Sequence, residues 1–262
     1  MRQSLVDVII PIYGAGNLLK ECVVNLYQSV KVPFDLYLVD DCSPGDEIAK
    51  IFDKVSKWKD EKIHLIQNRK NLGFGQSNNR AAKVGVSPFI LFLNSDTIPQ
   101  DSFLELMLLN YIDPTVGIVG AKLIFPKGST LGKENTIQHA GVARDKRGWP
   151  HHVFWQKDRD DPRVNVRREI NCVTGACLLI RRSLFKEIGG FDPRYKIGAW
   201  EDVDLCWTAR KKDWKVVYEP LAEVFHYCGG SGFKITHRKS DSNKIKLLEK
   251  WGNLGSDEDL FK

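Results

Sequence analysis

About the first hundred residues of this chain alternate short apolar runs with amphipathic segments, and this alternation restricts the folds open to it. The apolar runs, which predict buried strands, cover residues 6–12, 35–39, 62–67 and 88–93. The segments between them, which predict helices, cover residues 17–30, 46–58 and 76–84. Strands that alternate with helices over short connections are typical of a mainly parallel sheet with helices on both faces. The predicted fold class is therefore α/β.

The pattern is less regular after Phe125, where the sequence predicts a smaller, mixed half. Loops and short edge strands are expected in residues 127–147, which are rich in Gly, Lys and Thr, and in the charged and aromatic residues 151–168. The remaining expected elements are strands at 172–181, 216–218 and 222–225, helices at 183–188 and 201–212, and a basic helical tail at 233–251. We expect a single domain over residues 1–231, with halves at 1–98 and 99–231, followed by the tail 232–262.

Composition places few limits on the partner. The chain of 262 residues is 42% hydrophobic and 27% charged, as in an ordinary soluble globular protein with a substantial core. A net charge of +6 fits an anionic partner such as a phosphate ligand or a membrane surface, without requiring one. The aromatic residues follow no RNP-like or zinc-finger pattern, so we expect no nucleic acid partner. The basic tail predicts a solvated helix face, with a lipid-phosphate contact at a membrane as the alternative.

Cysteine spacing and the lack of long apolar segments predict the compartment. None of the six cysteines forms a C-x-x-C pair and most lie in apolar stretches, which favours reduced thiols and a reducing compartment. The N-terminus has no uninterrupted apolar region before Asp7 and Pro11, so no signal peptide is expected. No apolar run approaches the roughly 18 residues of a membrane-spanning helix. We expect a cytoplasmic chain, at most peripheral to the inner face of the cell membrane.

Polar residues follow the predicted strands at the points where these strands end. They are Pro11-Ile12-Tyr13, Asp40-Asp41 and Asn94-Ser95-Asp96. Ligands of parallel α/β sheets bind beyond the carboxyl ends of the strands, so we expect these residues to converge on one rim. Asp40 and Asp41 can accept from a nucleobase or from ribose hydroxyls, although Asp-Cys-Ser-Pro-Gly is also turn chemistry. Asp96 can bind Mg²⁺ or Mn²⁺ together with substrate phosphates, or it can cap a turn.

The segment Trp200-Glu201-Asp202-Val203-Asp204 places three carboxylates within four positions at the start of a predicted helix. Crowded carboxylates raise each other's pKa, and a helix N-terminus offsets this cost by only about 0.3–1 kcal/mol for each carboxylate. A harmless surface helix is one explanation. The acidic residue Asp96 and the strand-ending His226 favour another, namely a site for a metal, a diphosphate and a general base. The neutral imidazole of His226 suits Mn²⁺, and a buried, hydrogen-bonded histidine is the alternative.

Two glycine-containing segments would let the backbone approach a ligand. Asn71-Leu72-Gly73-Phe74-Gly75 continues to Asn78, where a dinucleotide-binding fingerprint requires a glycine, so a Rossmann dehydrogenase is not expected. The two glycines and the amide of Asn78 are candidates for ligand contact. Thr174-Gly175-Ala176 precedes an apolar strand, and it either lines the floor of a pocket or marks a strand entry with a bulge.

In this order and spacing, the motifs resemble glycosyltransferase family 2, the inverting enzymes with a GT-A fold. The resemblance extends from about Val6 to Ser231 and is closest to the rhamnosyltransferase-like branch that builds bacterial surface polysaccharides. The residues that carry it are 8–13, 39–43, 71–75, 93–96, 174–176, 189–192, 200–205 and His226. It implies a Rossmann-like, mainly parallel central sheet with helices on both faces, and a smaller mixed half on the acceptor side.

The resemblance also implies roles for these residues. Asp202 would be the general base, beside Glu201 in the family's E-D motif. Asp96 would be the last acid of the D-x-D metal motif, with His226 as a further ligand of Mn²⁺ or Mg²⁺. The first D-x-D position is Asn94, which removes a charge from the metal shell, although this branch often has N-x-D. The nucleotide-sugar site, within residues 1–98, would comprise Pro11, Tyr13, Asp40, Asp41, Asn71, Asn78, Asn94 and Ser95. The acceptor site, within residues 99–231, would include Thr174, Gly175 and Trp200.

The implied activity is inverting transfer of a hexosyl or deoxyhexosyl group from a nucleoside-diphosphate sugar, with dTDP-rhamnose or a UDP-sugar favoured. The acceptor would be a saccharide or lipid-linked saccharide in surface polysaccharide synthesis. Two alternatives stay open. A sugar-nucleotide nucleotidyltransferase would be expected to carry a basic, Gly-rich triphosphate loop, and residues 11–16 contain no Lys or Arg. A non-catalytic saccharide-binding or scaffold domain with the same fold would show no donor hydrolysis.

Overall fold

The computed structural model describes residues 3–58, 60–197, 199–229 and 233–261, and in the last range the side chains from residue 242 onward. The amino-terminal half forms the parallel part of one large sheet. Its strands are β1 (Val6–Ile12), β2 (Phe34–Asp40), β3 (Ile63–Gln67) and β4 (Phe89–Leu93). They lie in the order β4-β1-β2-β3, and each pair is parallel. The strands predicted from the apolar runs are thereby confirmed.

The second half adds strands of both directions to the same sheet. They are β5 (Thr97–Pro99), β6 (Val116–Ile124), β7 (Ile137–His139), β10 (Arg168–Ile170), β11 (Cys177–Arg181) and β12 (Lys215–His226). The sheet continues from β4 in the order β11-β6-β12-β10, with β11 antiparallel to both β4 and β6. A separate hairpin is formed by β8 (Val142–Arg144) and β9 (Pro150–His152). The short strands of the mixed half explain why this part of the sequence shows no clear periodicity.

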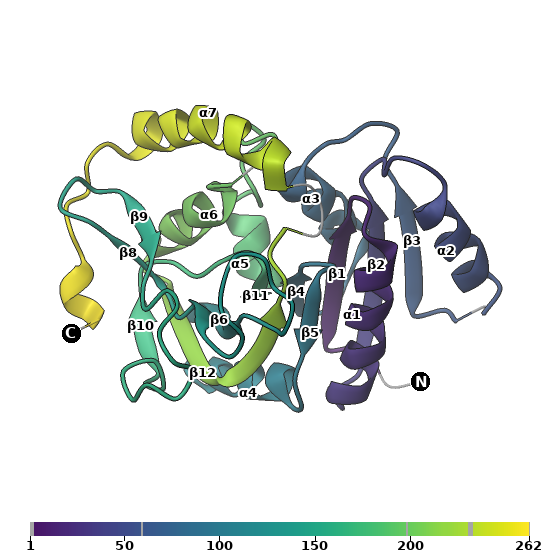
Figure 1. Cartoon of the computed structure of the whole chain (residues 1–262), viewed down its shortest axis with the longest axis horizontal. Helices are drawn as coiled ribbons and strands as arrows, with labels where there is room; N and C mark the ends of the chain where they lie inside the picture. The colour runs from purple at the N-terminus through teal and green to yellow at the C-terminus, as the bar shows by residue number, and fades with distance from the viewer. Residues whose placement is uncertain (1–2, 59, 198, 230–232, 262) are drawn as a thin grey trace.

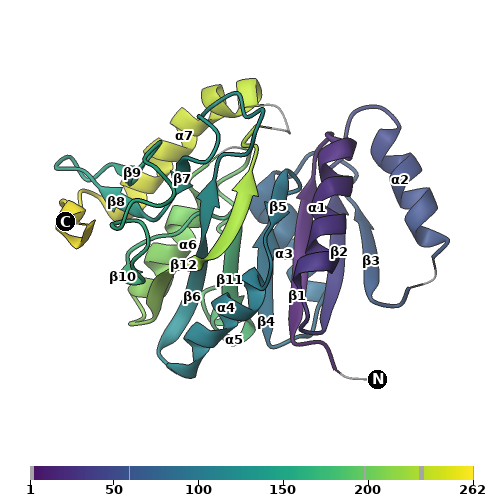
Figure 2. The same ribbon diagram turned by 60° about the horizontal axis from the view of Figure 1, so that its bottom comes forward.

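Helices cover both faces of the sheet. One face carries α1 (Gly16–Ser29), α2 (Glu47–Ser56) and α4 (Phe103–Leu109), and the other carries α3 (Phe74–Val84), α5 (Arg182–Glu187) and α6 (Glu201–Arg210). Figure 2 shows α1 and α4 in front of the sheet, with α3, α5 and α6 behind it. Because side chains alternate along a strand, Val8 and Ile10 of β1 pack with the first layer while Ile9 packs with the second. This arrangement confirms the predicted α/β fold class.

Two boundaries differ from the predicted ones. The two strands expected at 216–218 and 222–225 are a single strand, β12, whose register with β6 shifts between Glu219 and Glu223. Pro220 lies within this shift, and proline is tolerated at such a bulge because it has no N–H to donate to the ladder. The strand expected from residue 172 begins only at Cys177, so Thr174-Gly175-Ala176 forms a loop at the entry to β11.

The basic tail forms α7 (Phe233–Trp251), as predicted, followed by a short 3-10 helix, η2 (Glu258–Phe261). Figure 1 shows α7 passing over α6. Three of its lysines bind the protein itself. Lys246 Nζ donates to the carbonyl of Arg194 (2.8 Å), Lys250 Nζ pairs with Asp204 (2.8 Å), and Lys244 lies over the ring of Trp149 (3.5 Å). The side chains of Lys234, His237, Arg238 and Lys239, on which a membrane contact would also depend, lie outside the described residues.

Two further features bear on the predicted compartment. All six cysteines are free thiols, and Cys22, Cys172, Cys177 and Cys206 are buried. Within the ranges that the structure describes, we find no helix with the length and apolar character needed to cross a membrane.

A buried ion pair connects β1 to the start of α5, and it predicts a large effect on stability. Asp7 and Arg182 have side-chain exposures of 0% and 7%, and Arg182 also donates to the carbonyl of Ala82 (2.6 Å). Replacing Arg182 with Met leaves a buried, uncompensated carboxylate, so we expect the free energy of unfolding in urea to fall by about 3–5 kcal/mol. The control is the double variant Asp7→Asn/Arg182→Met, which should lose less. If both variants lost the same free energy of unfolding, the uncompensated charge of Asp7 would not be the cause of the loss.

Candidate active site

The carboxyl ends of β1, β2 and β4 meet at one edge of the sheet, which we call the rim. β11 begins at the same edge because it is antiparallel to β4, and the backbone N–H of Asn94 donates to the carbonyl of Ala176 there (2.9 Å). β12 also ends at the rim, where His226 pairs with Thr97 of β5. The strand order therefore brings the predicted nucleotide, metal and acceptor motifs to a single edge.

The two aspartates after β2 have different partners. Asp41 is buried, and its carboxylate accepts from Asn68 Nδ2 (2.8 Å) and from the backbone N–H groups of Leu72 (2.7 Å) and Gly73 (2.8 Å). These contacts fix the loop before α3. Asp40 accepts from the backbone N–H of Ser43 through Oδ1 (2.9 Å). Of the pair, Asp40 is the better candidate for a nucleotide contact, since Asp41 is occupied with positioning the loop.

The glycine loop packs against protein, which corrects part of its predicted role. Gly73 has a φ of +83°, and a Cβ built there would lie 2.0 Å from the carbonyl oxygen of Lys196. Glycine is required at this position by the backbone of Lys196 and Ile197. Asn78 is fully buried in α3, where its Nδ2 donates to the carbonyl of Phe74 (3.0 Å) and its Oδ1 has no hydrogen-bond partner, so the predicted ligand contact of Asn78 stays a prediction. Asn71 is half-buried, and its Oδ1 accepts from the N–H of Gly73 (3.1 Å).

Asp96 and His226 are adjacent, as a shared metal would require. Nε2 of His226 lies 3.1 Å from Oδ1 of Asp96 and 3.3 Å from Nδ2 of Asn94, and Nδ1 lies 2.8 Å from Oε1 of Gln138. The contact with Gln138 assigns the ring proton to Nδ1, so Nε2 presents a lone pair towards a carboxylate oxygen. Two acceptors facing each other at this distance repel unless a cation or a proton lies between them.

This donor set fits a divalent cation that shares its coordination with a substrate. In the described part of the chain, no group of three or more His, Cys, Asp or Glu side chains is placed to hold a metal. Mg²⁺ and Mn²⁺ commonly take only one or two carboxylates from the protein and complete their shell with phosphates and water. Asp96 and His226 would hold such an ion, and Asn94, half-buried beside them, would add an amide oxygen rather than a charge.

The three carboxylates at the start of α6 have three different environments. Asp202 is half-buried, and it accepts from the backbone N–H of Gly175 through Oδ2 (2.8 Å) and from that of Val203 through Oδ1 (2.9 Å). Asp204 is buried and bound to α7 through Lys250 and the indole N–H of Trp251 (2.7 Å). Asp202 is therefore the carboxylate of this helix that remains accessible at the rim.

Glu201 is buried, and its Oε2 has no hydrogen-bond partner. Burial, followed by the negative charge of Asp202, raises the pKa of Glu201 well above its ordinary value of 4.5. Burial thus favours the protonated form of Glu201. Of the predicted catalytic pair, Asp202 is therefore the better candidate for a base.

The raised pKa of Glu201 has a testable consequence for stability. The folded state keeps a proton that the unfolded chain releases, so the free energy of unfolding should fall as pH rises above the ordinary pKa. Glu201→Gln removes this dependence. As pH rises above about 5, we expect the variant to gain stability relative to the native chain by up to about 1.4 kcal/mol per pH unit, until the raised pKa of Glu201 is passed. If the free energies of unfolding of the native chain and of Glu201→Gln, measured by chemical denaturation, changed with pH in parallel, Glu201 would instead be ionised in the folded protein.

The predicted acceptor residues lie around Asp202. Thr174 is half-buried, and a Cβ on Gly175 would lie 3.3 Å from the Cβ of Asp202 and 3.0 Å from the Phe74 ring. Glycine at 175 thus lets the carboxylate reach the backbone N–H. Trp200 is half-buried at the start of α6 and has a left-handed backbone (φ 88°). On the opposite part of the rim, Pro11 and Tyr13 are half-buried, whereas Ser95 is buried.

Two histidines near this region were not singled out in the sequence. His139 ends β7 and is fully buried, and its Nδ1 lies 2.9 Å from Nδ1 of His152 at the end of β9. Nε2 of His139 accepts from the backbone N–H of Thr174 (3.3 Å). No local pattern identifies this pair, because the two residues meet only when β7 and the hairpin are folded.

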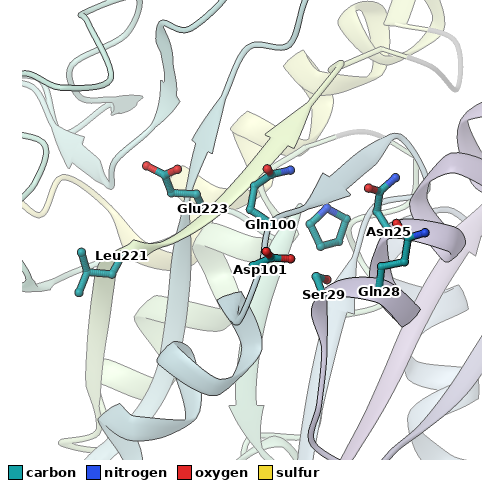
Figure 3. A pocket seen from close by; sticks show the side chains of 8 residues that line it. Asn25, Gln28, Ser29, Gln100, Asp101, Leu221 and Glu223 are labelled. Atoms are coloured by element: carbon teal, nitrogen blue, oxygen red, sulfur yellow. The ribbon is translucent and has the colours of Figure 1, made fainter.

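A cavity of about 330 Å³ lies away from these residues, between α1, the end of β5 and β12 (Figure 3). It is lined by Asn25, Gln28, Ser29, Pro99, Gln100, Asp101, Leu221 and Glu223. None of the predicted site residues lines it. The candidate active site is therefore the rim, where a ligand would meet Asp96, Asp202 and His226.

A mainly parallel central sheet with helices on both faces and polar side chains gathered at its carboxyl edge is the arrangement of a GT-A glycosyltransferase. The family model described as "Glycosyl transferase family 2" matches residues 7–189, well over half of the chain. The chain belongs to this family.

Several known proteins are similar to this chain in sequence or in fold. The O-antigen biosynthesis protein RfbC of Myxococcus xanthus is 29% identical over 85% of the chain, which spans only 17% of that protein. The N-acetylglucosaminyl-diphospho-decaprenol L-rhamnosyltransferase of Mycobacterium tuberculosis is 26% identical over 86% of the chain and 76% of its own length. Among solved structures, GalNAc-T7 with UDP, GalNAc and Mn²⁺ covers 96% of the chain with a TM-score of 0.75, and the chain covers 48% of it. At 17% identity, this last likeness shows the fold alone.

Proposed function

We propose that this protein is a metal-dependent, inverting glycosyltransferase that moves a sugar from a nucleoside-diphosphate sugar to a saccharide or lipid-linked saccharide. The observation that carries the proposal is that a candidate base and two candidate metal ligands lie on the same rim. An accessible carboxylate, Asp202, lies at the same sheet edge as the adjacent Asp96 and His226. A general base and a diphosphate-binding cation are the two parts that such a transfer needs.

Asp202 would act on the acceptor. A sugar hydroxyl is a poor nucleophile, and a carboxylate that accepts its proton during attack accelerates the reaction by about 10²–10⁴-fold. The backbone N–H groups of Gly175 and Val203 hold the carboxylate in place. Attack from the side opposite the departing diphosphate would invert the anomeric carbon.

Asp96 and His226 would hold the cation, whose contribution when bound is to neutralise charge on the departing diphosphate. Gln138 orients His226 through Nδ1, which leaves Nε2 directed at the metal position. Asn94 in place of an aspartate makes the site less negative, so binding of the ion would depend more on the donor's phosphates.

The donor and the acceptor are proposed from the names of similar proteins. The rhamnosyltransferase of M. tuberculosis and the O-antigen protein of M. xanthus favour dTDP-rhamnose or a UDP-sugar as donor, and a polysaccharide precursor as acceptor. We place donor binding in residues 1–98 and acceptor binding in residues 99–231. Action at the inner face of the cell membrane would follow from a lipid-linked acceptor.

Thermal unfolding with UDP, dTDP, GDP and CMP, each with and without Mn²⁺, tests the donor site. A ligand held at 100 times its Kd should stabilise the protein by about 2.7 kcal/mol. We expect one nucleoside diphosphate to stabilise it in a Mn²⁺-dependent way, which would also identify the donor's base. No response to any nucleotide would favour the saccharide-binding alternative. Release of pyrophosphate from a nucleoside triphosphate and a sugar 1-phosphate would favour the nucleotidyltransferase.

A further inference from the structure

The hairpin β8–β9 and the residues that follow it carry two exposed rings, His152 and Trp155. Arg144 of β8 lies over the Trp207 ring of α6 at 5.6 Å, which attaches the hairpin to the helix that carries Asp202. His152 and Trp155 are exposed, and their ring centroids are 6.0 Å apart. The Trp155 ring also packs edge-on against buried Phe125 (5.0 Å, 85°). The two rings are therefore accessible to a ligand and yet fixed in position.

Hydrogen bonds determine which nitrogen of His152 carries the proton. The N–H of Thr174 donates to Nε2 of His139, so the proton of His139 must lie on Nδ1. The Nδ1–H of His139 donates to Nδ1 of His152 at 2.9 Å, which leaves the proton of His152 on Nε2. The opposite tautomer of His139 would direct an N–H at the N–H of Thr174. The chain of bonds thus makes Nε2–H of His152 a fixed donor on the exposed side of the pair.

The electrostatic surroundings keep His139 neutral. Burial, followed by the positive charges that His152 and His226 carry when protonated, lowers the pKa of His139 well below its ordinary value. The site around His152 also includes the predicted base. Desolvation lowers the pKa of His152 below its ordinary value, and the negative charge of Asp202 opposes this effect. The N–H of Gly175, which follows Thr174 in the chain, donates to Oδ2 of Asp202 (2.8 Å). Hydrogen bonds therefore connect His152, through His139 and residues 174–175, to Asp202.

The chemistry of this surface fits a sugar ring. A tryptophan offers a large, rigid apolar face, and a neutral imidazole N–H offers a single oriented donor. The apolar face of a pyranose and one of its hydroxyls would satisfy both groups. A phosphate would instead require cationic donors, which neutral His152 does not supply.

We propose that His152 and Trp155 form a saccharide subsite for the acceptor, in which Trp155 stacks on a pyranose ring and Nε2–H of His152 donates to a hydroxyl. His139 is a positioning residue that fixes the tautomer of His152. The assignment of this sugar as the acceptor rests on the proposed function, whereas binding of a saccharide to the subsite does not.

NMR of the full chain labelled with ¹⁵N-histidine and ¹⁵N-tryptophan tests the subsite. The probes are the methyl glycosides of rhamnose, N-acetylglucosamine, galactose and mannose. We expect at least one to shift the Trp155 indole and the His152 ring signals, and to bind at least about tenfold more weakly to Trp155→Ala and to His152→Phe. Trp58→Ala, at another exposed tryptophan, is the matched control and should bind normally. The ring signals should also show His152 as the Nε2–H tautomer in the native chain and lose this state in His139→Leu.

Two results would overturn the inference. Either no glycoside shifts the signals of either ring in the native chain, or both ring variants still bind the glycoside and the remaining ring of each still shifts. Binding of UDP and dTDP with Mn²⁺ to the same samples separates the two proposals. Nucleotide binding with no glycoside effect would reject the subsite alone. Glycoside binding lost in the ring variants, with no nucleotide binding, would retain the subsite and reject the transferase.

Discussion

Replacing Asp202 with Asn is expected to lower sugar transfer by about 10²–10⁴-fold while leaving Mn²⁺-dependent nucleotide binding intact. The amide keeps the size of the carboxylate, and its oxygen can still accept from the backbone N–H of Gly175. What is lost is the capacity to take a proton from the acceptor. The measurement compares kcat for transfer with the nucleotide Kd in the same preparation.

Glu201→Gln is the matched control for this prediction. It makes the same chemical change one residue away, in a side chain that is buried and whose raised pKa already keeps it neutral. Transfer should therefore change little. Near-normal transfer in Asp202→Asn, or equal losses in the two variants, would show that the base has been assigned to the wrong residue.

The start of α6 shows how neighbouring carboxylates are separated in function by their surroundings. Asp202 meets two backbone N–H groups at the rim, Glu201 lies in the apolar interior, and Asp204 is bound to Lys250 and Trp251 of α7. The last contact makes α7 part of the fold around α6. This is a structural reason for the basic tail, and it uses lysines that could otherwise have faced a membrane.

The sequence predicts the parallel part of the fold well because its signals are local. Residues of β1 and β2 are mostly apolar on both faces, and such near-continuous apolar runs appear where a strand is buried on both faces. The mixed half gives weaker signals. Strands of three residues, such as β7 and β9, are too short to show a period, and the Pro220 bulge divides β12 into two apparent strands.

For the site, motif positions were predictable and individual contacts were not. The ends of strands indicated Asp96 and His226, which the structure brings to 3.1 Å. Whether a polar side chain faces a ligand or its own loop depends on residues far away in the sequence. Asn78 is fully buried, and the pair formed by His139 and His152 requires two separate strands to meet.

Replacing Asp96 with Asn is expected to separate metal binding from folding. The side-chain oxygen can still accept from the N–H of Gly229, and the new amide N–H can donate to Nε2 of His226, where two acceptors now face each other. We therefore expect the stability of the metal-free protein to be retained. The missing negative charge should abolish the Mn²⁺-dependent part of nucleotide binding and lower transfer by about 10²–10³-fold, in line with several kcal/mol of Lewis-acid stabilisation.

Asn94→Asp provides the converse variant, since it adds a carboxylate beside Nε2 of His226 and should tighten Mn²⁺ binding. Titration of Mn²⁺ into each variant, with and without the nucleoside diphosphate, measures both effects. Unchanged Mn²⁺-dependent binding in Asp96→Asn would place the cation elsewhere on the rim. A loss of metal-free stability in Asp96→Asn would instead indicate that Asp96 serves the fold. Because the two explanations predict opposite results for the metal-free protein, the isosteric change at Asp96 distinguishes a cation site from a buried hydrogen-bonded pair.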